Sequence, residues 1–128
     1  MSRDDAHFLR VAGEAIEAFP PPLRAAAREV VVQVAEWPTP EMMAEFGMTD
    51  PRELTGLYEG TPLPEKTASF PSPYPDTVWL FRQPILAEWR DRPGQDLDEL
   101  IAHVTVHEFA HHFGWSDDDI AEIDPWWE

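Results

Sequence analysis

The longest predicted helix spans residues 96–113 and constrains the fold of this chain more than any other segment. Apolar residues recur along one side of it at helical spacing, namely Ala102, Val106, Phe109 and Phe113. The opposite side also carries apolar residues, Leu100 and Val104. A helix with apolar residues on both sides is predicted to be largely buried, so the rest of the domain is expected to fold around it.

Two histidines, His107 and His111, lie four residues apart on the side of this helix opposite the main apolar stripe. On a buried helix they need partners, because an unsatisfied buried polar group costs roughly 1–3 kcal/mol. Residues at this spacing have Cβ atoms about 5–6 Å apart, so both imidazoles can bind one metal ion. The alternative is a pair of core histidines satisfied by hydrogen bonds. We favour a metal ion, because the pattern HExxH rarely arises by chance in so short a chain.

Glu108 follows the first histidine and lies about 100° around the helix from it. From this position its carboxylate reaches a water on the metal more easily than the metal itself. Zinc lowers the pKa of such a water to about 7, so a neighbouring carboxylate can act as its general base. Glu108 is therefore the predicted catalytic residue.

A catalytic zinc site needs a third protein ligand, and the sequence after the helix supplies candidates. Gly114 can end the helix and turn the chain back over the site. Asp117 is the first oxygen ligand after this turn, at the offset from His107 that the third ligand has in HExxHxxGxxH enzymes. The run 116–119 also fits a helix N-cap followed by acidic residues, and it holds the alternatives to Asp117, namely Asp118 and Asp119. The predicted zinc ligands are His107, His111 and Asp117.

The neighbouring histidines are predicted to lie outside the site. His103 comes one turn before His107 and is expected at the surface, although it could touch the edge of the site. His112 is expected to point away from the metal, as a surface or packing residue.

The remaining elements place this helix in an α+β domain. Further helices are predicted over residues 3–18, 23–28, 40–47 and 84–91, with a short last helix from residue 116. Strands are predicted over residues 30–37, 54–60 and 77–82. Residues 61–76 are rich in proline, so we expect a surface loop there and regard it as a candidate lid over the site.

Composition narrows the range of partners. The 128 residues, 43% of them hydrophobic, fit a single domain over residues 1–128. A formal net charge of -16 repels phosphate backbones and anionic lipid, so neither nucleic acid nor a membrane is a predicted partner. There is no cysteine, which excludes thiolate metal ligands. The N-terminal residues lack the apolar run of a signal peptide, so the expected location is the cytoplasm.

The segment HEFAHHFGWSDDDI resembles the signature HExxHxxGxxD of small bacterial zincin-like metallopeptidases, also called mini-zincins. LTGLYEGTPLPEKT and DTVWLFRQPIL resemble upstream segments of the same family, so the resemblance covers roughly residues 28–123. It implies a minimal zincin-like α+β fold, with a small mixed sheet packed on a central active-site helix and several short helices. It also implies hydrolysis of a peptide or protein substrate, with Glu108 in catalysis and one zinc ion per chain on His107, His111 and Asp117.

Peptide hydrolysis also needs a group that stabilises the oxyanion, worth about 2.7–4 kcal/mol per donor. The candidates are Tyr58, Tyr74 and Arg82. Tyr58 is the best placed of the three, because segment 54–60 could be an edge strand beside the cleft, where an extended substrate would add. Its alternative role is that of a half-buried strand tyrosine.

Two other functional classes compete with a peptidase. The chain could be a non-catalytic binding module derived from a zincin, which keeps the helix only for stability. It could also be a metal-dependent ribonuclease, which the net charge of -16 disfavours. Polypeptide deformylases share HExxH but use a cysteine ligand that this chain lacks.

Overall fold

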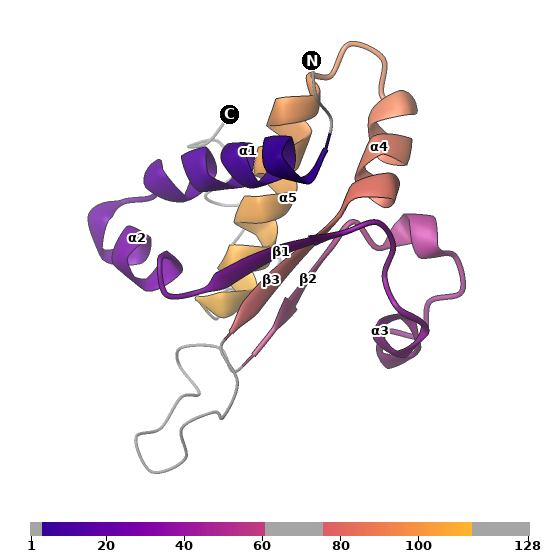
Figure 1. Cartoon of the computed structure of the whole chain (residues 1–128), viewed down its shortest axis with the longest axis horizontal. Coiled ribbons are helices and arrows are strands. Elements are labelled where there is room, and N and C mark those ends of the chain that lie inside the picture. The colour runs from indigo at the N-terminus through magenta and orange to yellow at the C-terminus, as the bar shows by residue number, and fades with distance from the viewer. Residues whose placement is uncertain (1–3, 61–75, 114–128) are drawn as a thin grey trace.

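The computed structural model describes residues 4–60 and 76–113 (Figure 1). Its α-helices are α1 (Asp5–Glu17), α2 (Pro21–Ala27), α3 (Pro40–Glu45), α4 (Arg82–Arg90) and α5 (Leu97–His112). Its strands are β1 (Val31–Ala35), β2 (Gly56–Glu59) and β3 (Thr77–Phe81), and a short 3-10 helix, η1, covers Pro51–Glu53. The α+β class predicted from the sequence is therefore confirmed. None of the helices in these residues is long and apolar enough to cross a membrane.

The three strands form a small mixed sheet in the order β1–β3–β2. β1 runs parallel to β3, with Val31 opposite Thr77, whereas β2 is antiparallel to β3, with Gly56 opposite Leu80. In central β3, Val78 and Leu80 are buried on one face of the sheet, whereas Thr77 and Trp79 on the other face are partly exposed. Among the described residues, β2 forms one edge of the sheet, and this strand contacts α5.

The main hydrophobic core lies between the sheet and the helix pair α1 and α5 (Figure 1). Phe19 joins these two helices, with its ring centroid 5.9 Å from that of Phe109 and 5.6 Å from that of Phe113. A smaller cluster of Leu54, Leu57 and Phe81 is packed by the partly buried Met42 of α3. The core therefore fixes one side of α5, which decides where its other side points.

Helix α5 confirms the central helix predicted from the sequence. Asp96 caps its N-terminus, because the side chain accepts a hydrogen bond from the backbone N–H of Glu99. Buried residues occur all around the helix: Leu97, Leu100, Ile101, Val104, Thr105, Val106, Phe109, Ala110 and His112. Such burial holds the axis of α5 rigidly, which suits a helix that carries a site.

The starts of helices α2 and α4 differ from the prediction for a physical reason. Helix α2 begins at Pro21 rather than at residue 23, because a proline fits the first turn, where the N–H has no helical partner. Helix α4 likewise begins at Arg82, directly after β3, with Pro84 in its first turn. The strands are shorter than predicted. The helix predicted from residue 116 and all of the proline-rich segment except Asp76 lie outside the described residues.

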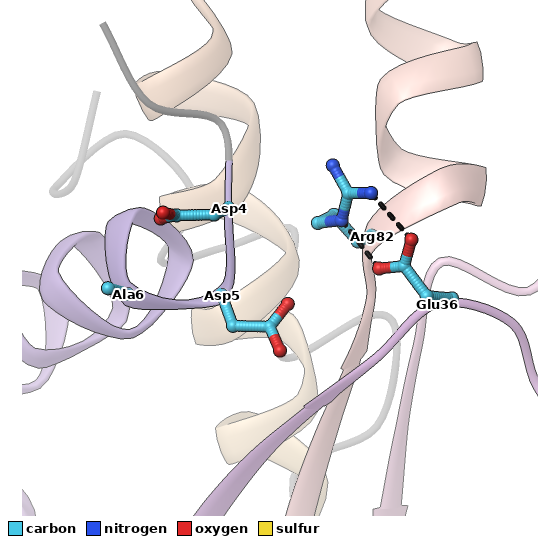
Figure 2. A pocket seen from close by; sticks show the side chains of 5 residues that line it. All are labelled: Asp4, Asp5, Ala6, Glu36 and Arg82. Atoms are coloured by element: carbon cyan, nitrogen blue, oxygen red, sulfur yellow. Dashed lines mark hydrogen bonds and ion pairs between the residues drawn. The ribbon is translucent and has the colours of Figure 1, made fainter.

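An ion pair joins the end of β1 to the start of α4 (Figure 2). Arg82 donates hydrogen bonds from Nε and Nη2 to the two carboxylate oxygens of Glu36, each at 2.5 Å. These bonds from Arg82, together with one from Gln83, lower the pKa of Glu36 to about 2. Asp4, the N-cap of α1, and Asp5, its first residue, border the same cavity of about 530 Å³.

Replacing Glu36 by glutamine is expected to destabilise the protein at neutral pH and to have a smaller effect in acid. The folded-state pKa of Glu36 is lowered from 4.5, so its contribution is complete above that pH and is lost as the pH falls through about 2. The carboxylate is 51% exposed, so we expect a contribution of only about 0.5–1 kcal/mol. Urea unfolding of both proteins at pH 7 and pH 2.5 measures this difference, and a constant difference would contradict the ionic origin.

Candidate metal centre

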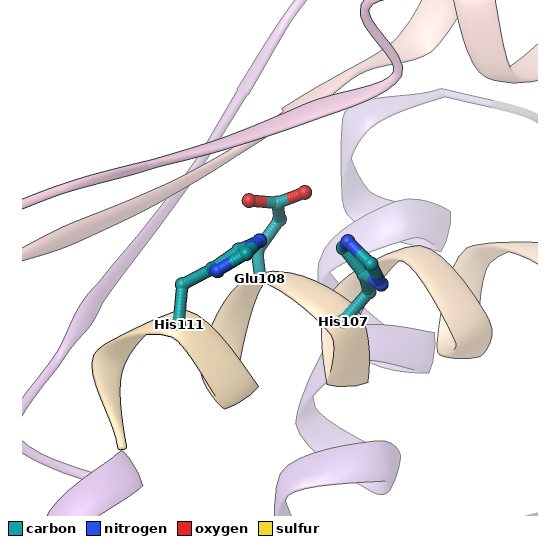
Figure 3. A group of neighbouring side chains, drawn as sticks. All are labelled: His107, Glu108 and His111. Carbon is teal, nitrogen blue, oxygen red and sulfur yellow. The ribbon is translucent and has the colours of Figure 1, made fainter. Parts of the chain in front are cut away.

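Three side chains converge on one side of α5: His107, Glu108 and His111 (Figure 3). One ligand atom from each residue, an imidazole nitrogen or a carboxylate oxygen, lies within 4.8 Å of the other two. The imidazole centroids are 5.0 Å apart and their planes are nearly perpendicular. Two imidazole nitrogens beside a carboxylate are a donor set that suits zinc and similar divalent ions. All three side chains are partly exposed, so a metal ion and a substrate can reach them.

The core packing of α5 determines where these side chains point. Phe109 and Ala110 are fully buried, and the three candidate residues lie on the remaining part of the helix surface. Glu108 leaves the helix on the side that faces β2, since its Cγ packs against the backbone at Gly56. The general-base candidate therefore lies between the two histidines and the edge of the sheet.

Gly56, the first residue of β2, allows this close approach of strand and helix. A Cβ atom at this position would lie 2.8 Å from Cγ1 of Val104 and 3.0 Å from Cγ of Glu108. Both distances are well below ordinary carbon–carbon contact, so any larger residue would push α5 or the Glu108 side chain away. This role of Gly56 was not predicted from the sequence, although a glycine inside a predicted strand is a known sign of close backbone approach.

The backbone of β2 also has a defined orientation relative to the site. The N–H of Phe81 donates to the carbonyl of Thr55 at 3.0 Å, so Thr55 and every second residue after it bond toward β3. By this alternation Gly56 and Tyr58 direct their N–H and C=O groups away from β3. β2 thus directs these backbone groups away from β3, and its first residue, Gly56, is the one that Glu108 approaches.

Other residues that the sequence singled out have different surroundings. His103 is exposed, as predicted. His112 is only 2% exposed, which confirms a packing role and excludes a surface one. The hydroxyl of Tyr58 lies 3.0 Å from Nδ1 of His112, which favours its alternative role as a half-buried strand tyrosine. Arg82 is bound to Glu36.

The third predicted ligand, Asp117, lies outside the described residues. The same holds for Asp118, Asp119 and Tyr74. The structure therefore describes two of the three predicted ligands, together with the predicted general base.

Comparison with known protein families gives a match over most of the chain. The model of a family described as zincin-like metallopeptidase matches residues 27–127. This range begins at the end of α2 and includes the whole sheet and α5. No curated protein matches the chain.

Proposed function

Since this chain belongs to the zincin-like metallopeptidase family, we propose that it is a zinc-dependent peptidase with Glu108 as its general base. The observation that carries this proposal is the convergence of His107, Glu108 and His111 within 4.8 Å of one another. His107 and His111 would hold the zinc ion together with Asp117. Bound there, zinc would polarise the scissile carbonyl and lower the pKa of a coordinated water to about 7.

Glu108 moves the proton in this mechanism. Its carboxylate accepts a proton from the attacking water as the water oxygen bonds to the peptide carbonyl carbon. The same carboxyl group then delivers that proton to the leaving amine nitrogen as the C–N bond breaks. The packing of its Cγ against Gly56 supports the proposal, because a base confined between strand and helix needs little reordering before it reacts.

An extended peptide is the substrate that best fits β2. A peptide strand could pair with the backbone groups of Gly56 and Tyr58, which point away from β3, and would then run past Glu108. Pairing through the backbone requires no particular substrate sequence. The formal net charge of -16 favours a neutral or basic peptide over a nucleic acid.

Zinc analysis of the wild type beside Asp117→Ala tests the proposed site. We expect one zinc per chain in the wild type after equilibration and desalting, and loss or marked weakening in the variant, because two histidines alone hold zinc poorly. Equal zinc in both proteins would move the third ligand to Asp118 or Asp119. A zinc-loaded wild type that cleaves no member of a peptide library would contradict the peptidase proposal. A wild type without zinc would favour the binding-module alternative.

A further inference from the structure

A polar cluster made of the buried Asp76 and His112 and the half-buried Tyr58 lies next to the candidate metal centre. The His112 side chain is 3% exposed and that of Asp76 is 8% exposed. Nδ1 of His112 lies 3.0 Å from the hydroxyl oxygen of Tyr58 and 3.4 Å from Oδ2 of Asp76. The rings of Tyr58 and His112 also meet edge to face, with centroids 5.4 Å apart. Polar groups as buried as these are stable only when they are paired, so the cluster holds its members in one arrangement.

The members of this cluster come from three separate parts of the fold. Tyr58 belongs to β2, Asp76 immediately precedes β3, and His112 is in the last turn of α5. The chain also closes tightly around them, because a Cβ atom at Gly60 would lie 2.2 Å from Oδ1 of Asp76 and 2.9 Å from the Tyr58 hydroxyl. The cluster therefore ties the end of α5 to the neighbouring strands β2 and β3.

The cluster and the metal centre share the last part of α5. His112 directly follows His111 and comes one helical turn after Glu108. Two residues along a strand span about 6.6–6.8 Å, and four residues along a helix span about 6 Å. Contacts two residues apart on β2 can therefore match contacts four residues apart on α5. Gly56 accordingly meets Glu108, and Tyr58, two residues later, meets His112.

The last turn of a helix needs such support, because its final carbonyl groups lack helical partners and the turn tends to fray. Phe109 and Phe113 hold this turn on its core side, where both rings pack on Phe19. On the side that faces the strands, the contact is made by His112. In the sequence of this turn, His111 lies between Phe109 and His112.

We propose that Asp76, His112 and Tyr58 are positioning residues, which fix the last turn of α5 and thereby direct His111 toward the metal. The inference rests on the proposed metal site but not on peptide hydrolysis. It predicts a loss of metal affinity from changes to residues that contact no metal, as is known for groups that orient metal ligands.

The test is the zinc affinity of Tyr58→Phe, measured by competition with a chromophoric chelator. This change keeps the ring and removes only the hydroxyl. We expect the Kd for zinc to rise about 10-fold, at the lower end of the effects of orienting groups. Asp76→Asn, which keeps the size of the side chain, is a second variant and is expected to weaken zinc binding in the same direction.

Thr105→Val is the matched control, because it removes another buried hydrogen bond from the same helix. Thr105 Oγ1 donates to the Ile101 carbonyl at 2.8 Å, so this bond stays within α5 and does not involve β2 or β3. We expect its Kd for zinc to equal that of the wild type. Unchanged zinc affinity in both Tyr58→Phe and Asp76→Asn would overturn the proposal, even if both variants melted at lower temperature. Zinc binding without peptide cleavage in the wild type would overturn only the peptidase, whereas a wild type that binds no zinc would overturn both.

Discussion

Replacing Glu108 by glutamine is expected to leave zinc bound and to lower kcat/KM for a peptide substrate by about 10²–10⁴-fold, the usual contribution of a general base. Glutamine has nearly the same shape as glutamate, so it should keep the packing of Cγ beside Gly56. Its amide cannot accept the proton of the attacking water. Because His107 and His111 are unchanged, the variant should still bind zinc.

Zinc content and peptide cleavage must both be measured, because only together do they distinguish loss of the general base from loss of the metal. The matched control is Glu99→Gln, which makes the same chemical change at an exposed position in the first turn of α5. This control should keep both zinc and activity. Wild-type activity in Glu108→Gln would refute the role of Glu108 as base. Loss of zinc from Glu108→Gln would show instead that the carboxylate is a metal ligand, which its position within 4.8 Å of both imidazoles also allows.

The convergence of the two histidines was predictable from the sequence because it depends on one element only. The spacing of His107 and His111 places them on one side of any α-helix, whatever surrounds it. The helix itself was predicted from its apolar residues, which recur at helical spacing on two sides. The structure confirms both predictions.

Contacts between elements could not be predicted in this way. His112 lies about 140° around the helix from His107, and periodicity alone cannot tell whether that direction meets solvent or a strand. In the structure β2 occupies it, so His112 is buried against Tyr58 rather than at the surface. The role of Gly56 could not be predicted either, because it depends on the close approach of β2 to Glu108 of α5, which is distant in sequence.

The errors in element boundaries have the same origin, because the end of a strand also depends on contacts between elements. The hydrophobic pattern of residues 30–37 continues past the end of β1, but a strand ends where its pairing ends, and β1 pairs with β3 only over Val31–Ala35. The prolines in the first turn of α2 allowed two predictions, because proline occurs both after the end of a helix and in the first turn of one. Local sequence therefore predicts which elements form more reliably than where they end.

Truncating either histidine of the pair, in His107→Ala or His111→Ala, is expected to weaken zinc binding by at least about 100-fold. Changes to groups that merely orient a ligand cost about 10–100-fold, and loss of the ligand itself should cost more. Both side chains are partly exposed, so their truncation should leave little cavity and the variants should fold. Competition with a chelator measures the affinity, and thermal unfolding of the zinc-free proteins verifies the fold.

His103→Ala is the matched control for this pair, because it removes an exposed histidine from the same helix one turn before His107. It should bind zinc as the wild type does. A similar loss in all three variants would point to general weakening of α5 rather than to ligation. If His107→Ala and His111→Ala both bind zinc normally, the two histidines are not ligands. The resemblance of α5 to a zincin helix would then reflect stability or ancestry, and the binding-module alternative would replace the peptidase.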